Sequence, residues 1–102
     1  MSADHKKFLD ELIATVEKEG ASDLHLTEGR SPIIRVAGFL IPLTKMPVLS
    51  ATDMHGLMDL LMSPENKQRF IADREIDFSY AQHTTRFRGN GFFRQGVPSV
   101  AL

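Results

Sequence analysis

EIDFSYAQHTTRFRGNGFFRQGVPSVAL, residues 75–102, is the stretch of sequence that decides the fold. Apolar and polar side chains alternate along 75–80 and again along 85–93, a period of two that is typical of half-buried β-strands. A further strand is expected from Val97 to Leu102. The segments that join these strands are short, which favours antiparallel hairpins over the long crossovers of a parallel sheet.

The sequence before this stretch begins with a helical pattern and continues with strand patterns. Apolar side chains at helical spacing place a helix at residues 3–19, and Gly20 is a natural stop at its carboxyl end. Three strands are then expected, at residues 22–27, 33–37 and 39–43.

Two helices are predicted between the two groups of strands. Ser50 with Asp53 forms an imperfect capping box for the first of them. Ser63 and Pro64 begin the second, which we expect to run to about Asp73 and to bury Phe70 and Ile71. Helices grouped between hairpin-linked strands predict an α+β fold, with an antiparallel sheet of about five to six strands, an N-terminal helix and two helices inserted between strands.

Length and composition limit the class of protein. The 102 residues suffice for one domain with one modest core, and 42% apolar and 25% charged residues are ordinary for a globular protein. The absence of cysteine excludes disulfides and thiolate metal sites. No signal peptide and no apolar run of about 20 residues is present, so we expect a cytoplasmic protein. The last strand pattern reaches Leu102 without a turn or a polar tail, and we therefore expect the sequence to be part of a longer protein.

Charge is distributed unevenly along the chain. All thirteen acidic residues lie at or before Asp77, and the only lysines or arginines after it are Arg86, Arg88 and Arg94. A basic segment next to an acidic domain often marks a site for an anionic partner or ligand. The alternative is that the arginines face water, or pair weakly with nearby carboxylates, for which the candidates are Asp73, Glu75 and Asp77.

The segment TRFRGNGFFR, residues 85–94, is the best candidate for chemistry. Strand alternation would place Arg86, Arg88, Asn90 and Arg94 on one face, with Phe87, Gly91 and Phe93 on the other. The arginine guanidinium suits phosphate because it is planar, permanently charged and able to donate two parallel hydrogen bonds.

Glycines and histidines in the chain match no catalytic or metal-binding motif. Gly89, Gly91 and Gly96 have neither the dinucleotide-binding spacing nor a following Gly-Lys-Ser/Thr, so we expect them to relieve crowding between strands. The four histidines are scattered without metal-ligand spacing, and no metal site is expected. His25 and Asp23 share a strand face. They could orient an imidazole for acid–base chemistry, but a structural tie to an adjacent helix or loop is the favoured interpretation.

Five segments of the chain resemble successive motifs of the PilT family of type IV pilus retraction (twitching motility) ATPases, within the secretion ATPase superfamily. Together they cover nearly the whole chain in order. The segments are ASDLHL (21–26), IRVAG (34–38), EIDFS (75–79), RFRGN (86–90) and FRQG (93–96) with SVAL (99–102).

This resemblance implies that residues 1–102 are a PAS-like N-terminal domain, normally followed by a RecA-like motor domain and assembled into a homohexamer. It implies ATP and magnesium in the longer parent, bound mainly by the motor domain, and none for this domain alone. By position in the RFRGN motif, Arg88 is the first choice for a contact to the ATP phosphates, with Arg86 next and Arg94 third. The contact would act as an arginine finger and couple hydrolysis to domain movement.

The family also implies partners and location. The partners would be the domain's own C-terminal motor domain, neighbouring subunits and the platform proteins of the pilus machinery at the inner membrane, and no nucleic acid is expected. The longer parent would be cytoplasmic and peripherally associated with that machinery. The chain itself contains no phosphate-binding (Walker A) or magnesium-binding (Walker B) motif, so we do not expect it to be an enzyme by itself.

The sequence departs from the family pattern at three places. Gly89 stands where valine is common, Ala37 where an acidic residue is common, and Pro98 falls within a strand, which predicts an edge strand or a bulge because proline cannot donate a ladder hydrogen bond. Two alternatives to a retraction ATPase stay open. One is a stand-alone PAS-like ligand- or protein-binding module, and the other is the same domain of a type II secretion or pilus-assembly ATPase.

Overall fold

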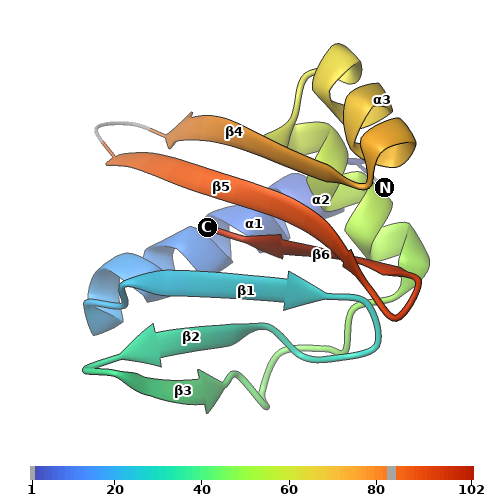
Figure 1. Cartoon of the computed structure of the whole chain (residues 1–102). Helices are drawn as coiled ribbons and strands as arrows, with labels where there is room; N and C mark the ends of the chain where they lie inside the picture. The colour runs from blue at the N-terminus through green and yellow to red at the C-terminus, as the bar shows by residue number, and fades with distance from the viewer. Residues whose placement is uncertain (1, 83–84) are drawn as a thin grey trace.

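The structure is a computed structural model that describes residues 2–82 and 85–102 (Figure 1). The predicted order of helix, three strands, two helices and three strands is confirmed. The elements are α1 (Ser2–Glu19), β1 (Asp23–Thr27), β2 (Ile33–Val36), β3 (Phe39–Pro42), α2 (Ala51–Leu61), α3 (Pro64–Asp73), β4 (Glu75–Gln82), β5 (Thr85–Arg94) and β6 (Val97–Ala101).

The six strands form one antiparallel sheet in the order β3-β2-β1-β6-β5-β4. The predicted α+β fold class is therefore confirmed. β6 lies in the middle and pairs with β1 from the first group of strands and with β5 from the second, which joins the two groups into a single sheet. In Figure 1 the three helices lie behind this sheet, on one side of it. No helix formed by the described residues covers the opposite side, which we call the open face.

The hydrophobic core fills the space between the helices and the sheet. Alternate residues of the central strands point into it, including Leu24, Leu26 and Val100, and they meet the apolar sides of α1, α2 and α3. Phe70 of α3 is fully buried, and its ring centroid lies 5.0 Å from that of Phe93 in β5. Ile71 is 49% exposed, so the prediction that it is buried was wrong. Successive helical residues point about 100° apart, and α3 packs against the sheet along one narrow side. With Phe70 on that side, Ile71 points away from it.

Pro98 lies in the central strand β6, and the register from Arg94↔Val97 to Asn90↔Ala101 advances one residue at a time. The expectation of an edge strand or a bulge was therefore wrong. The β5–β6 hairpin closes with two left-handed residues, Gln95 and Gly96, and the residue next to the closing pair directs its nitrogen away from β5. On that other side, the register with β1 ends at Thr27↔Ser99, and the Pro98 carbonyl oxygen accepts a last hydrogen bond of 3.5 Å from the N–H of Glu28. The missing N–H of Pro98 therefore costs one hydrogen bond, at the end of the β1–β6 ladder and not in its middle.

A complete capping box fixes the start of α2. The Ser50 side chain accepts a hydrogen bond from the backbone N–H of Asp53 at 3.0 Å, and the Asp53 carboxylate accepts one from the N–H of Ser50 at 2.9 Å. His5 of α1 adds a contact of 3.3 Å to the same carboxylate. The backbone hydrogen bond from Ser50 is the main reason that the pKa of Asp53 lies below its ordinary value of 3.8.

Replacing Asp53 by alanine is expected to lower the free energy of unfolding by about 1 kcal/mol at neutral pH. Because the pKa of Asp53 is lower in the folded state than in the unfolded state, this stabilisation is present above pH 3.8 and is lost as the pH falls through the folded pKa. Urea unfolding of both proteins from pH 7 downward would show the difference shrinking in acid. Ser50→Ala is the matched control, because its hydroxyl does not titrate and its cost should persist at low pH. A pH-independent cost for Asp53→Ala would contradict the prediction.

Candidate functional site

The arginines of β5 lie on the open face of the sheet. Arg86, Arg88 and Arg94 are exposed, whereas Phe87 and Phe93, which alternate with them, pack against the core. The predicted division of this strand into two faces is confirmed. It arises because successive side chains of a strand point to opposite sides, and here one of those sides is covered by helices.

The glycines of β5 lie under aromatic rings. Gly89 is paired with Phe78 of β4, and a Cβ atom at position 89 would fall 2.6 Å from Cε2 and 2.7 Å from Cε1 of that ring. A Cβ atom on Gly91 would fall 3.1 Å from Phe70. The prediction that glycines relieve crowding is confirmed for Gly89 and Gly91 but was wrong for Gly96, which has open space around it and a left-handed φ of 84° in the β5–β6 turn. The segment is an extended strand rather than a phosphate-binding loop.

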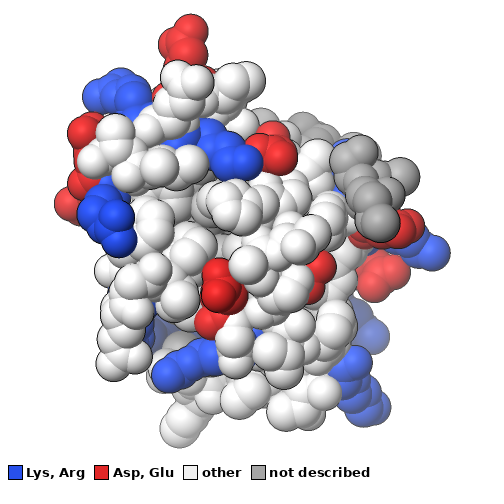
Figure 2. All heavy atoms as spheres, turned by 90° about the vertical axis from the view of Figure 1, so that its right-hand side faces the viewer, with Lys and Arg blue, Asp and Glu red and all other residues white. Residues whose placement is uncertain are grey.

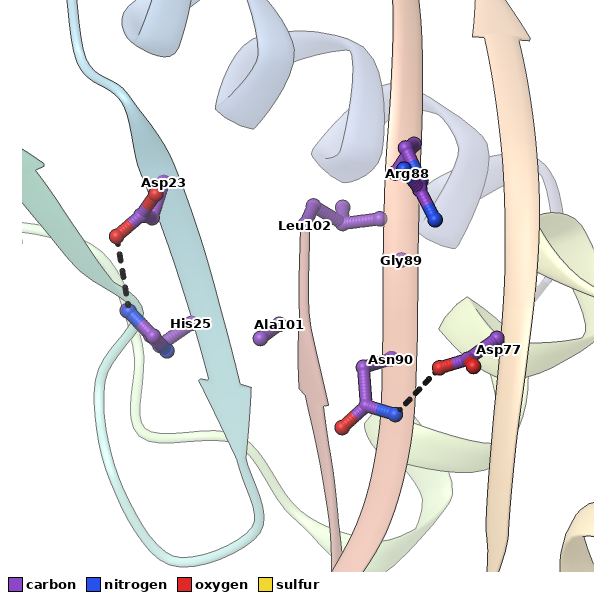
Figure 3. Close-up of a pocket in the computed structure, with 8 residues that line it drawn as sticks. All are labelled: Asp23, His25, Asp77, Arg88, Gly89, Asn90, Ala101 and Leu102. Carbon is purple, nitrogen blue, oxygen red and sulfur yellow. Dashed lines mark hydrogen bonds and ion pairs between the residues drawn. The ribbon is translucent and has the colours of Figure 1, made fainter.

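Four adjacent strands of the open face enclose a shallow hollow of about 410 Å³, which we call the sheet hollow (Figure 3). Arg88 is its one arginine, and it lies there with two carboxylates and an imidazole. The lining residues are Asp23 and His25 from β1, Asp77 from β4, Arg88, Gly89 and Asn90 from β5, and Ala101 and Leu102 at the end of β6.

Both carboxylates of the sheet hollow are engaged by side chains other than Arg88. Asn90 donates its amide N–H to Asp77 at 2.8 Å, and Arg35 of β2 donates its Nε–H to Asp23 at 2.8 Å. Among residues 2–82 and 85–102, Arg88 makes no hydrogen bond or ion pair, and the same holds for Arg86 and Arg94. The weak arginine–carboxylate pairs considered from the sequence are therefore not formed within the described part of the chain. The guanidinium of Arg88 is free to meet an outside anion.

The structure does not gather the three arginines at one point. Arg86 is two residues along β5 from Arg88, roughly 7 Å away, and lines a separate small hollow with Ser79, Tyr80 and Ala81. Arg94 is six residues from Arg88, roughly 20 Å along the strand, beside the β5–β6 turn. One phosphate chain could therefore approach Arg88 and Arg86 together, but not Arg88 and Arg94.

His25 and Asp23 do not form an acid–base pair. The His25 Nε2 lies 3.8 Å from the Asp23 Oδ2, which is too long for a hydrogen bond, and that oxygen already accepts from Arg35. Asp23 therefore ties β1 to the neighbouring strand β2, rather than to a helix or loop. Over the described residues, the His25 Nε2 and the Ser99 Oγ are buried without a hydrogen-bond partner.

Sequence reasoning missed the two pairs that occupy the carboxylates, Asn90–Asp77 and Arg35–Asp23. Both join residues that lie opposite each other on paired strands. The strands themselves were predicted, and aligning them by their hairpin turns would have placed these residues side by side.

Charges elsewhere are mixed. On the side of the molecule seen in Figure 2, acidic and basic side chains alternate with uncharged ones and form no broad patch of one sign. No group of three or more histidine, aspartate or glutamate residues within 2–82 and 85–102 could hold a metal ion. In the same part of the chain, every helix is too short or too polar to span a membrane.

Known proteins with similar sequences are pilus ATPases. The chain is 38% identical over 85 residues to the type IV pilus retraction ATPase PilT of Pseudomonas aeruginosa, a match that covers 82% of this chain and 24% of PilT. It is 28% identical over 94 residues to the type IV pilus ATPase PilU of the same organism, covering 91% of this chain and 24% of PilU. The chain thus spans about a quarter of the length of these relatives. No family model matches it.

Solved structures with the same fold include the pilus retraction motor PilT with bound ADP. The TM-score is 0.79 with 34% identity, and the match covers 89% of this chain and 27% of that one. The ATPase DotB of Legionella pneumophila matches with a TM-score of 0.78 and 22% identity, over 93% of this chain and 27% of DotB. At that identity the likeness to DotB shows the fold alone.

The fold and these matches define a domain of the type IV pilus ATPase kind. More particularly, the chain is homologous to PilT and PilU, and it corresponds to the N-terminal region of PilT.

Proposed function

We propose that this chain is the regulatory and mechanical N-terminal domain of a hexameric type IV pilus retraction ATPase. In this proposal the domain supplies arginines to an ATP site whose other side is formed by a motor domain, and its movement is coupled to hydrolysis. The proposal rests on one observation: the Arg88 guanidinium is exposed at the sheet hollow of a domain homologous to PilT, and it has no partner among residues 2–82 and 85–102.

The chemistry of the open face supports a contact to phosphate oxygens. An arginine that has no carboxylate partner need not break an ion pair before it binds an anion, so its charge is available to an incoming phosphate. Within residues 2–82 and 85–102, the face has no glycine-rich loop and no helix N-terminus to enclose a nucleotide by itself. It can therefore complete a nucleotide site but not form one alone. ATP and magnesium would be held mainly by the motor domain.

The position of Arg88 would couple ATP hydrolysis to movement of the domain. Arg88 can reach a nucleotide held by another domain only when the two domains close, so the closed arrangement would be favoured while ATP is bound and lost after phosphate release. The partners of this domain would then be its own motor domain, the neighbouring subunits of the ring and the inner-membrane platform of the pilus. The charged and polar lining of the sheet hollow gives less support to a stand-alone PAS-like module that binds an apolar ligand.

ATP hydrolysis is expected from the longer protein that carries this domain and not from residues 1–102 alone. The gene sequence after Leu102 should encode Gly-x-x-x-x-Gly-Lys-Ser/Thr, because this loop holds the phosphates in such motors. Released phosphate, measured for both proteins at equal concentration, checks the activity. A longer protein without this loop, or measurable turnover by residues 1–102, would contradict the proposal.

A further inference from the structure

Arg88 has an acidic neighbour that it does not bind. In the β4–β5 pairing, Ser79 lies opposite Arg88 and Asp77 lies opposite Asn90, so Asp77 is the diagonal neighbour of Arg88 on the same face. Diagonal residues on antiparallel strands are about 7–8 Å apart at Cα, a distance that long side chains can bridge. An arginine–aspartate ion pair is therefore within reach at this place, yet none is formed.

Asn90 occupies the carboxylate instead. Its Nδ2 lies 2.8 Å from the Asp77 Oδ1 and 3.4 Å from the backbone oxygen of Ile76. Two acceptors on the same side fix the amide orientation, because only the NH₂ group can donate to both. Figure 3 shows the Asn90 amide nitrogen turned toward Asp77 and its carbonyl oxygen turned away, with no interaction drawn to Arg88.

The second acid of the sheet hollow is engaged in the same way. Asp23 accepts the 2.8 Å hydrogen bond from Arg35, on the side of the hollow away from Arg88. Each carboxylate in the hollow thus has a donor that is not Arg88. This leaves Arg88 as the hollow's one charged group without a partner in the described part of the chain.

We propose that Asn90 is a positioning residue that keeps Arg88 free for phosphate by engaging Asp77. Asn90 is neutral, so it satisfies the carboxylate without adding a charge that would compete for the anion. Without its amide, the Asp77 Oδ1 loses its donor, and Arg88 is the cation that shares the sheet hollow with it. Arg69 of α3 lines a separate hollow with Asp77, and Arg88 differs from it in lying on the same face of the sheet as the diagonal neighbour. The inference rests on the proposed function for its consequence in catalysis, but the competition between Asn90 and Arg88 for Asp77 belongs to this domain itself.

Hydrolysis by the longer protein tests the catalytic consequence. Asn90→Ala is expected to lower kcat/KM for ATP about fivefold. This is the factor expected if Arg88 must first break an exposed ion pair with Asp77 of the strength found at the upper end for such pairs. Adding Asp77→Asn should restore the rate to within about twofold, because no carboxylate is left to capture Arg88. Glu75→Gln is the matched control, because it removes the same charge from the same face of β4. Glu75 lies two residues farther along the strand from Arg88 than Asp77 does, so this substitution should restore nothing. Equal rescue by both acid substitutions, or by neither, would overturn the proposal.

The Arg88 side chain gives a readout that does not depend on ATP. The domain has a hydrophobic core of its own, so the 102-residue chain can be studied by NMR. The Nε–H signal of Arg88 is expected to exchange rapidly with water in the parent chain, to become slower in Asn90→Ala, and to be rapid again in Asn90→Ala/Asp77→Asn. An Arg88 signal that is unchanged in Asn90→Ala would refute the role of Asn90. If this signal behaves as expected and Arg88→Ala leaves hydrolysis intact, the proposed function fails while the competition for Asp77 stands.

Discussion

Replacing Arg88 by alanine in the longer ATPase is expected to reduce the rate of ATP hydrolysis by about 100-fold or more, with ring assembly intact. Single donors aimed at charge that develops in a transition state contribute about 10²–10³ in kcat, and arginine fingers of phosphoryl-transfer enzymes contribute more. Arg88 is exposed and bonded to no described residue, so its removal leaves no buried partner without a donor. The loss should therefore appear in turnover rather than in stability.

Three comparisons make this expectation specific. Arg88→Lys keeps the charge but loses the planar pair of donors, and we expect it to recover only part of the activity. Arg86→Ala should cost less than Arg88→Ala, because Arg86 lies outside the sheet hollow. Arg94→Ala should cost least, because Arg94 is roughly 20 Å along the strand. Initial rates of phosphate release, with ring formation checked by size-exclusion chromatography, give the order. Unchanged turnover for Arg88→Ala would remove its assigned role.

Local pattern was enough to predict the elements and faces of this domain. The alternation of Arg86, Phe87 and Arg88 is visible in the sequence, and the covered side of a strand is the apolar side in a domain with one core. The cap at Ser50 is equally local, since its partner Asp53 is three residues away. Such features depend on neighbours along the chain, and the sequence displays those directly.

Features that depend on the order of the strands in the sheet and on their exact register were not predicted. Pro98 was expected at an edge or bulge, but the order of strands places β6 at the centre, and the proline is tolerated because it lies at the end of the pairing with β1. The contact between Asn90 and Asp77 likewise follows from the β4–β5 register. A shift of that register by one residue would turn either side chain to the other face, so the pairing has to be known before the contact can be inferred.

Gly89→Val is expected to be the most destabilising of the substitutions considered for this domain. The backbone at position 89 is that of an ordinary strand, so the cost is steric. A Cβ atom there would lie within 2.7 Å of Cε1 of Phe78 and closer still to Cζ, and the ring is 8% exposed and packed into the core. Overpacking of this kind costs about 1–3 kcal/mol, and we expect the upper end. For a domain of this size, that lowers Tm by about 12 °C or more, measurable by thermal unfolding followed by circular dichroism.

If the Phe78 ring occupies the space above Gly89, the effects of substitutions at these two positions on stability should depend on each other. Phe78→Leu alone should destabilise the domain by leaving space over Gly89, and in that background Gly89→Val should cost less than in the parent chain. Gly91→Ala is the graded control, because its added methyl would meet Phe70 at 3.1 Å and Met62 at 3.2 Å and requires only small shifts. Additive effects of Phe78→Leu and Gly89→Val would contradict the fit. Coupling would show that the residue tolerated at position 89 of this chain depends on the size of the side chain opposite it at position 78.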